Sequence, residues 1–249
     1  MSITHLLILF AVGMVASFFN VAAGGGSLLT LPVLIFMGLP ATVANATNRI
    51  GIISQNIFAV AGFRSKGVGV WPYSLYIAIS AFFGAILGAR ISANLDDALF
   101  NKIIAIIMIG VGVMTVFGKK KVVQDSEKLS RNRQIVGVIT FFFVGVYGGF
   151  IQAGVGFIMI AALTTINGLS LVKTNSAKVF VALIYSLSAV GVFIYEDLIS
   201  WPHGLALALG NALGGWITSR WSVAKGDKWL KPILLIAVTV MPVKLWLDY

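Results

Sequence analysis

The chain has 249 residues, of which 59% are hydrophobic and only 10% are charged, and its formal net charge is +10. Soluble domains carry about 25% charged residues, so this composition excludes an ordinary water-soluble domain and indicates a polytopic membrane protein. The absence of cysteine excludes disulfides and thiolate metal sites. The basic residues lie mainly in short loops between apolar runs, which favours a role in membrane topology over nucleic-acid binding.

Ten apolar runs follow one another along the chain, and each predicts a helical segment, since none alternates like a β-barrel strand. Two of these runs, 27–38 and 157–168, have only 12 residues. A 12-residue helix is about 18 Å long, which is short of the ~30 Å hydrocarbon core. We interpret both as re-entrant or broken half-helices, with full spans as the alternative. The ten runs are 3–22, 27–38, 41–63, 71–92, 98–118, 134–152, 157–168, 170–195, 201–222 and 229–247.

The first five runs match the last five at a constant offset of 130 residues. The offset holds without a gap over about seventy residues, which indicates an internal duplication. We predict a first repeat at 1–118, a basic cytoplasmic linker at 119–133 and a second repeat at 134–249. The offset aligns Gly24–Gly26 with Gly154–Gly156, Gly38 with Gly168, Asn45 with Asn175, Trp71-Pro72 with Trp201-Pro202, Gly84 with Gly214, Arg90 with Arg220 and Asp97 with Asp227.

The distribution of basic residues predicts that the two repeats are inverted. If the linker is cytoplasmic, the turn at 64–66 and the loop at 220–231 lie inside, whereas their repeat partners at 194–196 and 90–102 lie outside. Fourteen basic residues, Lys178 included, then lie toward the cytoplasm and four, Arg49 included, toward the outside.

The predicted fold is therefore all-α, with eight to ten helical segments in two inverted repeats. Each repeat has a re-entrant or broken hairpin and three spanning helices. The expected location is a bacterial inner membrane, with the chain crossing it several times and both termini outside.

Glycine loops precede the two short runs and are the first candidate substrate-binding elements. A helix breaks within lipid only where protein or a water-filled cavity supplies hydrogen-bond partners. We expect the loop glycines to leave backbone N–H groups free at the starts of the half-helices, where the helix dipole favours an anion. The alternative is that these glycines only permit tight turns or close packing. They are Gly24, Gly25, Gly26, Gly154 and Gly156.

Polar side chains cluster in the helix that follows each half-helix. Such groups are costly in lipid unless they face a cavity or one another. Amides and hydroxyls on neighbouring turns can donate several hydrogen bonds to one oxyanion, and Lys178 would add positive charge. Alternatively, Asn45 and Asn175 cap helices or satisfy the broken backbone. The candidates are Asn45, Thr47, Asn48, Thr174, Asn175 and Lys178, together with Gln152 just before the second glycine loop.

All eight acidic residues fall in expected loops or at a terminus. Cation pumps and proton relays usually keep a carboxylate within the membrane, so this placement favours an anionic substrate. Gly84, Gly88, Gly210 and Gly214 have the spacing of helix-packing positions. No metalloprotease, nucleophile-elbow or phosphate-loop motif is present, so we expect no enzymatic activity, no cofactor and no metal site.

The first-half motif resembles the TauE/SafE family of sulfite and organosulfonate exporters, also called TSUP. It reads Asn20-Val-Ala-Ala-Gly-Gly-Gly-Ser-Leu-Leu-Thr-Leu-Pro32, then Gly38-Leu-Pro-Ala-Thr-Val-Ala-Asn45-Ala-Thr47-Asn48. A weaker echo, Gln152-Ala-Gly-Val-Gly156, lacks a proline matching Pro32, and Lys178 stands at the position of Asn48. The resemblance implies a small sulfur-containing anion as cargo, such as sulfite, sulfoacetate or thiosulfate.

We therefore predict a secondary transporter, with an exporter favoured over an importer. Alternating access would expose a midplane site between the two glycine-loop hairpins. The expected partners are a small anionic substrate and the lipid bilayer, without nucleic acid. A passive anion channel and an importer of another small anion are the alternatives. The coupling ion and the oligomeric state are left open.

Overall fold

The computed structural model describes residues 2–117 and 127–226, and this part of the chain contains nine α-helices and no strand. The all-α prediction is confirmed over these residues. The predicted run at 229–247 and most of the linker lie outside them. The helices are α1 (Ile3–Ala22), α2 (Ser27–Phe36), α3 (Ala41–Arg64), α4 (Tyr73–Ala93), α5 (Asp97–Phe117), α6 (Arg131–Phe150), α7 (Val155–Asn167), α8 (Leu171–Tyr195) and α9 (Trp201–Lys225).

Helix length separates two classes of segment. Helices α1, α4, α6 and α8 are long and apolar enough to cross a membrane. Helices α3 and α9 are also long, with 24 and 25 residues, but carry more polar side chains. Helices α2 and α7 have only 10 and 13 residues, about 15–20 Å, and are therefore shorter than the hydrocarbon core.

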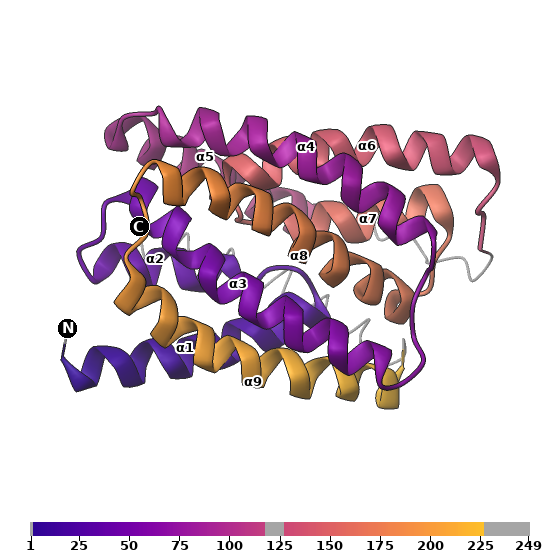
Figure 1. Ribbon diagram of the computed structural model, residues 1–249, viewed down its shortest axis with the longest axis horizontal. Coiled ribbons are helices and arrows are strands. Elements are labelled where there is room, and N and C mark those ends of the chain that lie inside the picture. The colour runs from indigo at the N-terminus through magenta and orange to yellow at the C-terminus, as the bar shows by residue number, and fades with distance from the viewer. Residues whose placement is uncertain (1, 118–126, 227–249) are drawn as a thin grey trace.

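Six of the seven helices with 20 residues or more, α1, α3, α4, α6, α8 and α9, lie side by side along the long axis of the molecule (Figure 1), and α5 is the seventh. Helix α9 packs against α1 and α3, and α4 packs against α6 and α8. Contact between α3 and α8 joins the two groups of three. Each group thus contains two helices from one half of the sequence and one helix from the other half.

Corresponding helices run in opposite directions along this axis. Figure 1 shows α1 and α3 running one way and α6 and α8 the other, and α4 and α9 are likewise opposed. An inverted repeat requires these directions. The duplication itself stays a prediction, because the last segment of the second half lies outside the described residues.

The loops separate into two sets at opposite ends of the bundle. The α3–α4 turn, the start of α6 and the end of α9 lie at one end, and the α4–α5 and α8–α9 connections lie at the other (Figure 1). This grouping agrees with the predicted pairing of loops. Placing the first end in the cytoplasm remains a prediction.

Two residues in the sequence-based charge count do not belong there. Arg49 is fully buried in α3 and Lys178 is 3% exposed in α8. Both side chains are turned into the bundle and bind backbone carbonyls there, so they are not among the loop charges that set membrane topology.

Small residues bring α4 and α6 into backbone contact. A Cβ on Gly145 of α6 would lie 2.7 Å from the Cα of Ala81 in α4. Added Cβ atoms on Gly84 and Gly88 would overlap α6 in turn, and those on Gly210 and Gly214 would overlap α1. These four glycines are therefore packing positions, as their spacing predicts.

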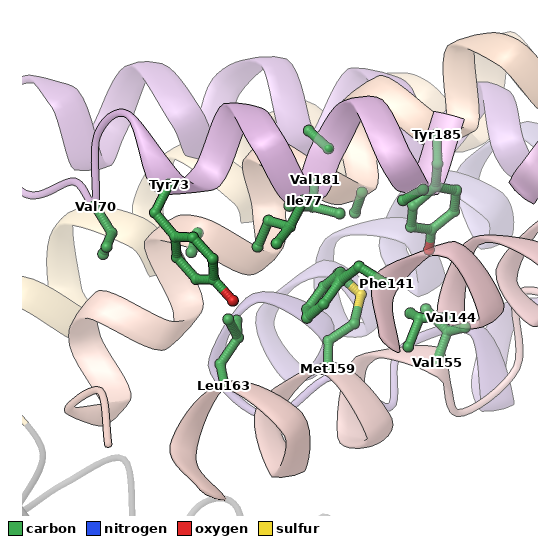
Figure 2. Close-up of a cluster of buried hydrophobic side chains, with 14 of the residues drawn as sticks. Val70, Tyr73, Ile77, Phe141, Val144, Val155, Met159, Leu163, Val181 and Tyr185 are labelled. Atoms are coloured by element: carbon green, nitrogen blue, oxygen red, sulfur yellow. The ribbon is translucent and has the colours of Figure 1, made fainter. Parts of the chain in front are cut away.

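A buried apolar cluster fixes the half-helix α7 against three long helices (Figure 2). Met159 and Leu163 of α7 pack in this cluster with Ile77 of α4 and Phe141 of α6. At the C-terminal end of α7, the Tyr73 hydroxyl donates a hydrogen bond of 2.9 Å to Asn167 Oδ1. The cluster thereby positions the glycine loop from which α7 starts.

Substituting Gly145→Ala should destabilise the bundle by about 1–3 kcal/mol, because the new methyl group overlaps the α4 backbone. The matched control is Gly110→Ala in α5, where a Cβ meets no described atom within 4 Å. Alanine is the better helix former, so the control should melt at or above the parent temperature. Thermal unfolding in detergent measures both, and equal melting temperatures would contradict the packing role.

Candidate binding site between two broken helices

Two glycine loops interrupt the helices near the middle of the bundle. Gly24 follows α1 with φ +94°, and Gly154 precedes α7 with φ +75°. L side chains rarely adopt this left-handed conformation, so glycine is required at both positions. The Gly24 N–H donates to the carbonyls of Phe19 and Asn20, at 3.0 and 2.9 Å. The expectation that this N–H is free for a ligand was wrong, because it closes the last turn of α1.

The loop that follows α1 touches the first turn of α7 through the backbone. A Cβ on Gly24 would lie 2.6 Å from Gly156 Cα, and one on Gly156 would lie 2.8 Å from the carbonyl carbon of Gly24. The chain therefore brings together two glycines that are separated by more than half of its length.

Several backbone N–H groups at the starts of the half-helices have no partner in the described part of the chain. They belong to Gly25, Gly26 and Ser27 before and within α2, and to Val155 and Gly156 in α7. The first N–H groups of a helix point along its axis and favour negative charge.

Side chains of α3 satisfy the end of α6. Asn45 Nδ2 donates to the Phe150 carbonyl at 3.0 Å, and Arg49 donates to the Gly149 carbonyl at 2.7 Å and to Gln152 Oε1 at 3.1 Å. The Arg49 guanidinium also lies 5.2 Å from the centroid of the Phe193 ring. These contacts pair carbonyls left open where α6 stops and place positive charge at the negative end of its dipole.

Side chains of α8 satisfy the end of α1 in the same way. Asn175 Nδ2 donates to the Ala22 carbonyl at 3.0 Å. Lys178 Nζ donates to the carbonyls of Asn20 and Val21, at 2.8 and 2.9 Å, and to Asn175 Oδ1 at 2.8 Å. An ammonium has three donors, so all of them are used by protein.

The capping role that the sequence left open for Asn45 and Asn175 is therefore the one seen in their contacts. The sequence-based list omitted Arg49 although it is charged and lies eight residues into a membrane helix, which is itself a signal of function.

No carboxylate lies beside these two buried cations in residues 2–117 and 127–226. All five described acidic residues are exposed. Asp97 accepts two hydrogen bonds from Thr42 at the start of α3, and Glu127 forms an ion pair with Lys173. The centre of the bundle thus has an excess of positive charge.

Buried polar atoms without partners lie on the α2–α3 hairpin. Among the described residues they include both amide atoms of Asn48 and the hydroxyls of Ser27 and Thr30, and also Arg49 Nε and Asn56 Nδ2; single atoms on α7, α8 and α9 are unpaired too. Leaving such an atom unpaired costs about 1–3 kcal/mol, so each needs an explanation such as a bound molecule or water. The sequence analysis predicted Asn48 as a site residue but not Ser27 and Thr30. The feature that could have identified these two is their spacing of three residues, which places both hydroxyls on one face of a short helix.

Helix register places Thr30 and Asn48 at the same level of the hairpin. Leu34 of α2 and Ala44 of α3 share a buried cluster. The hairpin is antiparallel, so Thr30, one turn back on α2, is at the level of Asn48, one turn forward on α3.

The remaining predicted side chains are Gln152, which lies in the buried polar network, and Thr47 and Thr174, which bind the backbone of helix connections. Gln152 lies between Arg49 and Tyr185, donating a hydrogen bond of 3.0 Å to the Tyr185 hydroxyl. Thr47 accepts from the Ser200 N–H at 2.9 Å, and Thr174 donates to the Leu169 carbonyl at 3.4 Å. The two threonines therefore bind connections between helices.

A family model described as sulfite exporter TauE/SafE matches residues 9–245. A probable membrane transporter protein of Haemophilus influenzae is 29% identical, over 98% of this chain and 95% of its own length. The probable membrane transporter protein YfcA of Escherichia coli is 30% identical, over 97% and 89% respectively. No solved structure matches.

The family match covers nearly the whole chain, and its relatives are named as membrane transporters, which is compatible with the absence of enzymatic activity. The fold agrees, since residues 2–117 and 127–226 form an all-helical bundle with four apolar helices of membrane-spanning length, as in a multi-pass membrane protein. The chain belongs to the TauE/SafE family of membrane transporters.

Proposed function

We propose that this chain is a secondary transporter of a small sulfur-containing oxyanion such as sulfite or sulfoacetate, working as an exporter. The observation that carries the proposal is the excess of buried positive charge at the two broken helices. Arg49 and Lys178 are buried, and every described carboxylate is exposed. The description of the matching family supports sulfite as the cargo and export as the direction.

The proposed contacts to the anion come from the α2–α3 hairpin. Ser27, Thr30 and Asn48 offer two hydroxyl donors and an amide, and all three are buried without partners among the described residues. The N–H groups of Gly25 and Gly26 add backbone donors at the start of α2. Several donors converging on one point suit a compact oxyanion.

In this proposal, four other residues of the interior do not contact the anion and act on it indirectly. Lys178 and Asn175 bind the end of α1, and Arg49 and Asn45 bind the end of α6. Their hydrogen bonds are made to the protein, so they contribute through charge and by holding the loops in place. Positive charge in a low-dielectric interior attracts an anion without direct contact.

Alternating access is the transport mechanism that we propose. Gly24 and Gly156 are in backbone contact, so the two loops close the space between them. An anion passing between the loops requires them to separate. Movement of one group of three helices against the other, across the α3–α8 contact, would separate the loops.

Proteoliposomes loaded with sulfite test the proposed activity. We expect saturable sulfite efflux at fewer than ~10³ ions per second per molecule, competed by sulfoacetate, since each cycle includes a conformational change. Vesicles of the same lipid without protein are the control. Much faster, non-saturable flux would indicate a channel, and saturable flux of short carboxylates alone would reject the sulfur oxyanion.

Asn48→Ala should remove the stabilisation that sulfite gives to the purified protein, because it deletes a proposed contact. For the parent, ligand at 100 times its Kd raises stability by about 2.7 kcal/mol, measured as a shift in melting temperature. Asn56→Ala, a buried asparagine two turns along the same helix, is the matched control and should keep the shift. Equal shifts in both variants would exclude Asn48 from the site.

Lys178→Met should lower stability without any ligand by about 1–3 kcal/mol, since the carbonyls of Asn20 and Val21 lose their donor. Lys66→Met, on an exposed turn, should stay within about 0.5 kcal/mol of the parent. Thermal melting without anion measures this. If the melting temperature of Lys178→Met equals that of the parent, the ammonium does not stabilise the end of α1.

A further inference from the structure

We propose that the groove between α4 and α8 is a specific binding site for a zwitterionic phospholipid of the phosphatidylethanolamine type. The groove has a volume of about 650 Å³, within the ~300–1,000 Å³ usual for ligand sites. It lies apart from the glycine loops, on an exposed side of α8, and goes beyond the transport function proposed above.

The groove is charged at one end and mainly apolar along the rest, where the Ser188 hydroxyl is bonded to backbone carbonyls. Arg90 of α4 and Glu196, just after α8, stand at the end nearest the α4–α5 and α8–α9 connections. Farther from the charged end, Phe82 and Ile86 line the groove from α4, and Leu187 lines it from α8. An amphiphile with a charged head and an apolar tail matches this division.

The charges at the polar end are available to a ligand. Within residues 2–117 and 127–226, neither the Arg90 guanidinium nor the Glu196 carboxylate takes part in a hydrogen bond or an ion pair. A phosphoethanolamine head carries both complementary charges. Its phosphate would bind Arg90 and its ammonium would bind Glu196. An anionic headgroup alone would leave the Glu196 carboxylate facing like charge.

The dimensions of the groove fit one leaflet of a bilayer. From Arg90 to Phe82 is eight residues, about 12 Å along the helix, close to the ~15 Å depth of half a hydrocarbon core. Tyr195 lines the polar end and is 86% exposed, which is typical of an aromatic residue at the membrane interface.

Gly191 keeps the groove open on the α8 side. A Cβ at this position would meet no described atom within 4 Å. A larger side chain can therefore fill the groove without displacing the backbone. Gly191→Leu should block the lipid and leave the fold intact, which a melting curve verifies.

Native mass spectrometry of the full chain, titrated with dioleoyl phosphatidylethanolamine or dioleoyl phosphatidylglycerol, tests the proposal. For phosphatidylethanolamine we expect about tenfold weaker binding in Arg90→Gln and Glu196→Gln, since a hydrogen bond to a charged group is worth at least that factor. In Gly191→Leu the new side chain fills the groove, so binding should be lost. Glu196→Gln should not weaken phosphatidylglycerol binding. The matched controls are Gly110→Leu, at an open position on α5, and Lys66→Gln, at the opposite end of the bundle, and both should bind like the parent.

Equal binding in Gly191→Leu and Gly110→Leu would overturn the proposal. A preference for phosphatidylglycerol that Glu196→Gln leaves unchanged would also overturn it, because Glu196 would then not bind the ethanolamine ammonium. A change from dimer to monomer in Gly191→Leu with unchanged lipid binding would assign the groove to a second copy of the chain instead. These results are independent of sulfite transport.

Discussion

Pairing the backbone at two broken helices is the constraint on which the rest of this structure depends. Where α1 and α6 stop inside the bundle, their last carbonyls would be unpaired in a medium that offers no water, at a cost of several kcal/mol each. Asn175 and Lys178 satisfy the first end, and Asn45 and Arg49 satisfy the second. Each end is held by a helix from the other half of the sequence, so the two halves stabilise each other's break.

This arrangement links packing to charge. Holding two helix ends with cations places positive charge in the interior, and the described carboxylates do not compensate it because they are exposed. Such an interior disfavours cations and attracts small anions. The small residues of α4, α6 and α9 let the long helices approach closely enough to enclose these polar contacts. A structural solution to broken helices thus also sets the sign of the cargo that we propose.

Much of the fold could be predicted because lipid imposes strict rules on sequence. Helices α1, α3 and α8 begin and end within one residue of the predicted runs, since uninterrupted apolar stretches leave few alternatives. The candidate site was harder. Asn45, Asn175 and Lys178 were found because polar residues in lipid are conspicuous, but Ser27 and Thr30 were missed. Their hydroxyls are common in membrane helices, and only burial without a partner makes them notable.

The sequence by itself determined that the chain is a membrane-embedded helical protein, where its helices break, and which residues there are polar, because hydropathy and glycine act locally. Only the tertiary structure decided which groups those polar residues meet. A lysine in an apolar helix has the same cost whether it binds a ligand or a carbonyl, and three-dimensional packing put Lys178 on the end of α1. The contact of Gly24 with Gly156 has the same origin, since it joins residues that no local rule relates.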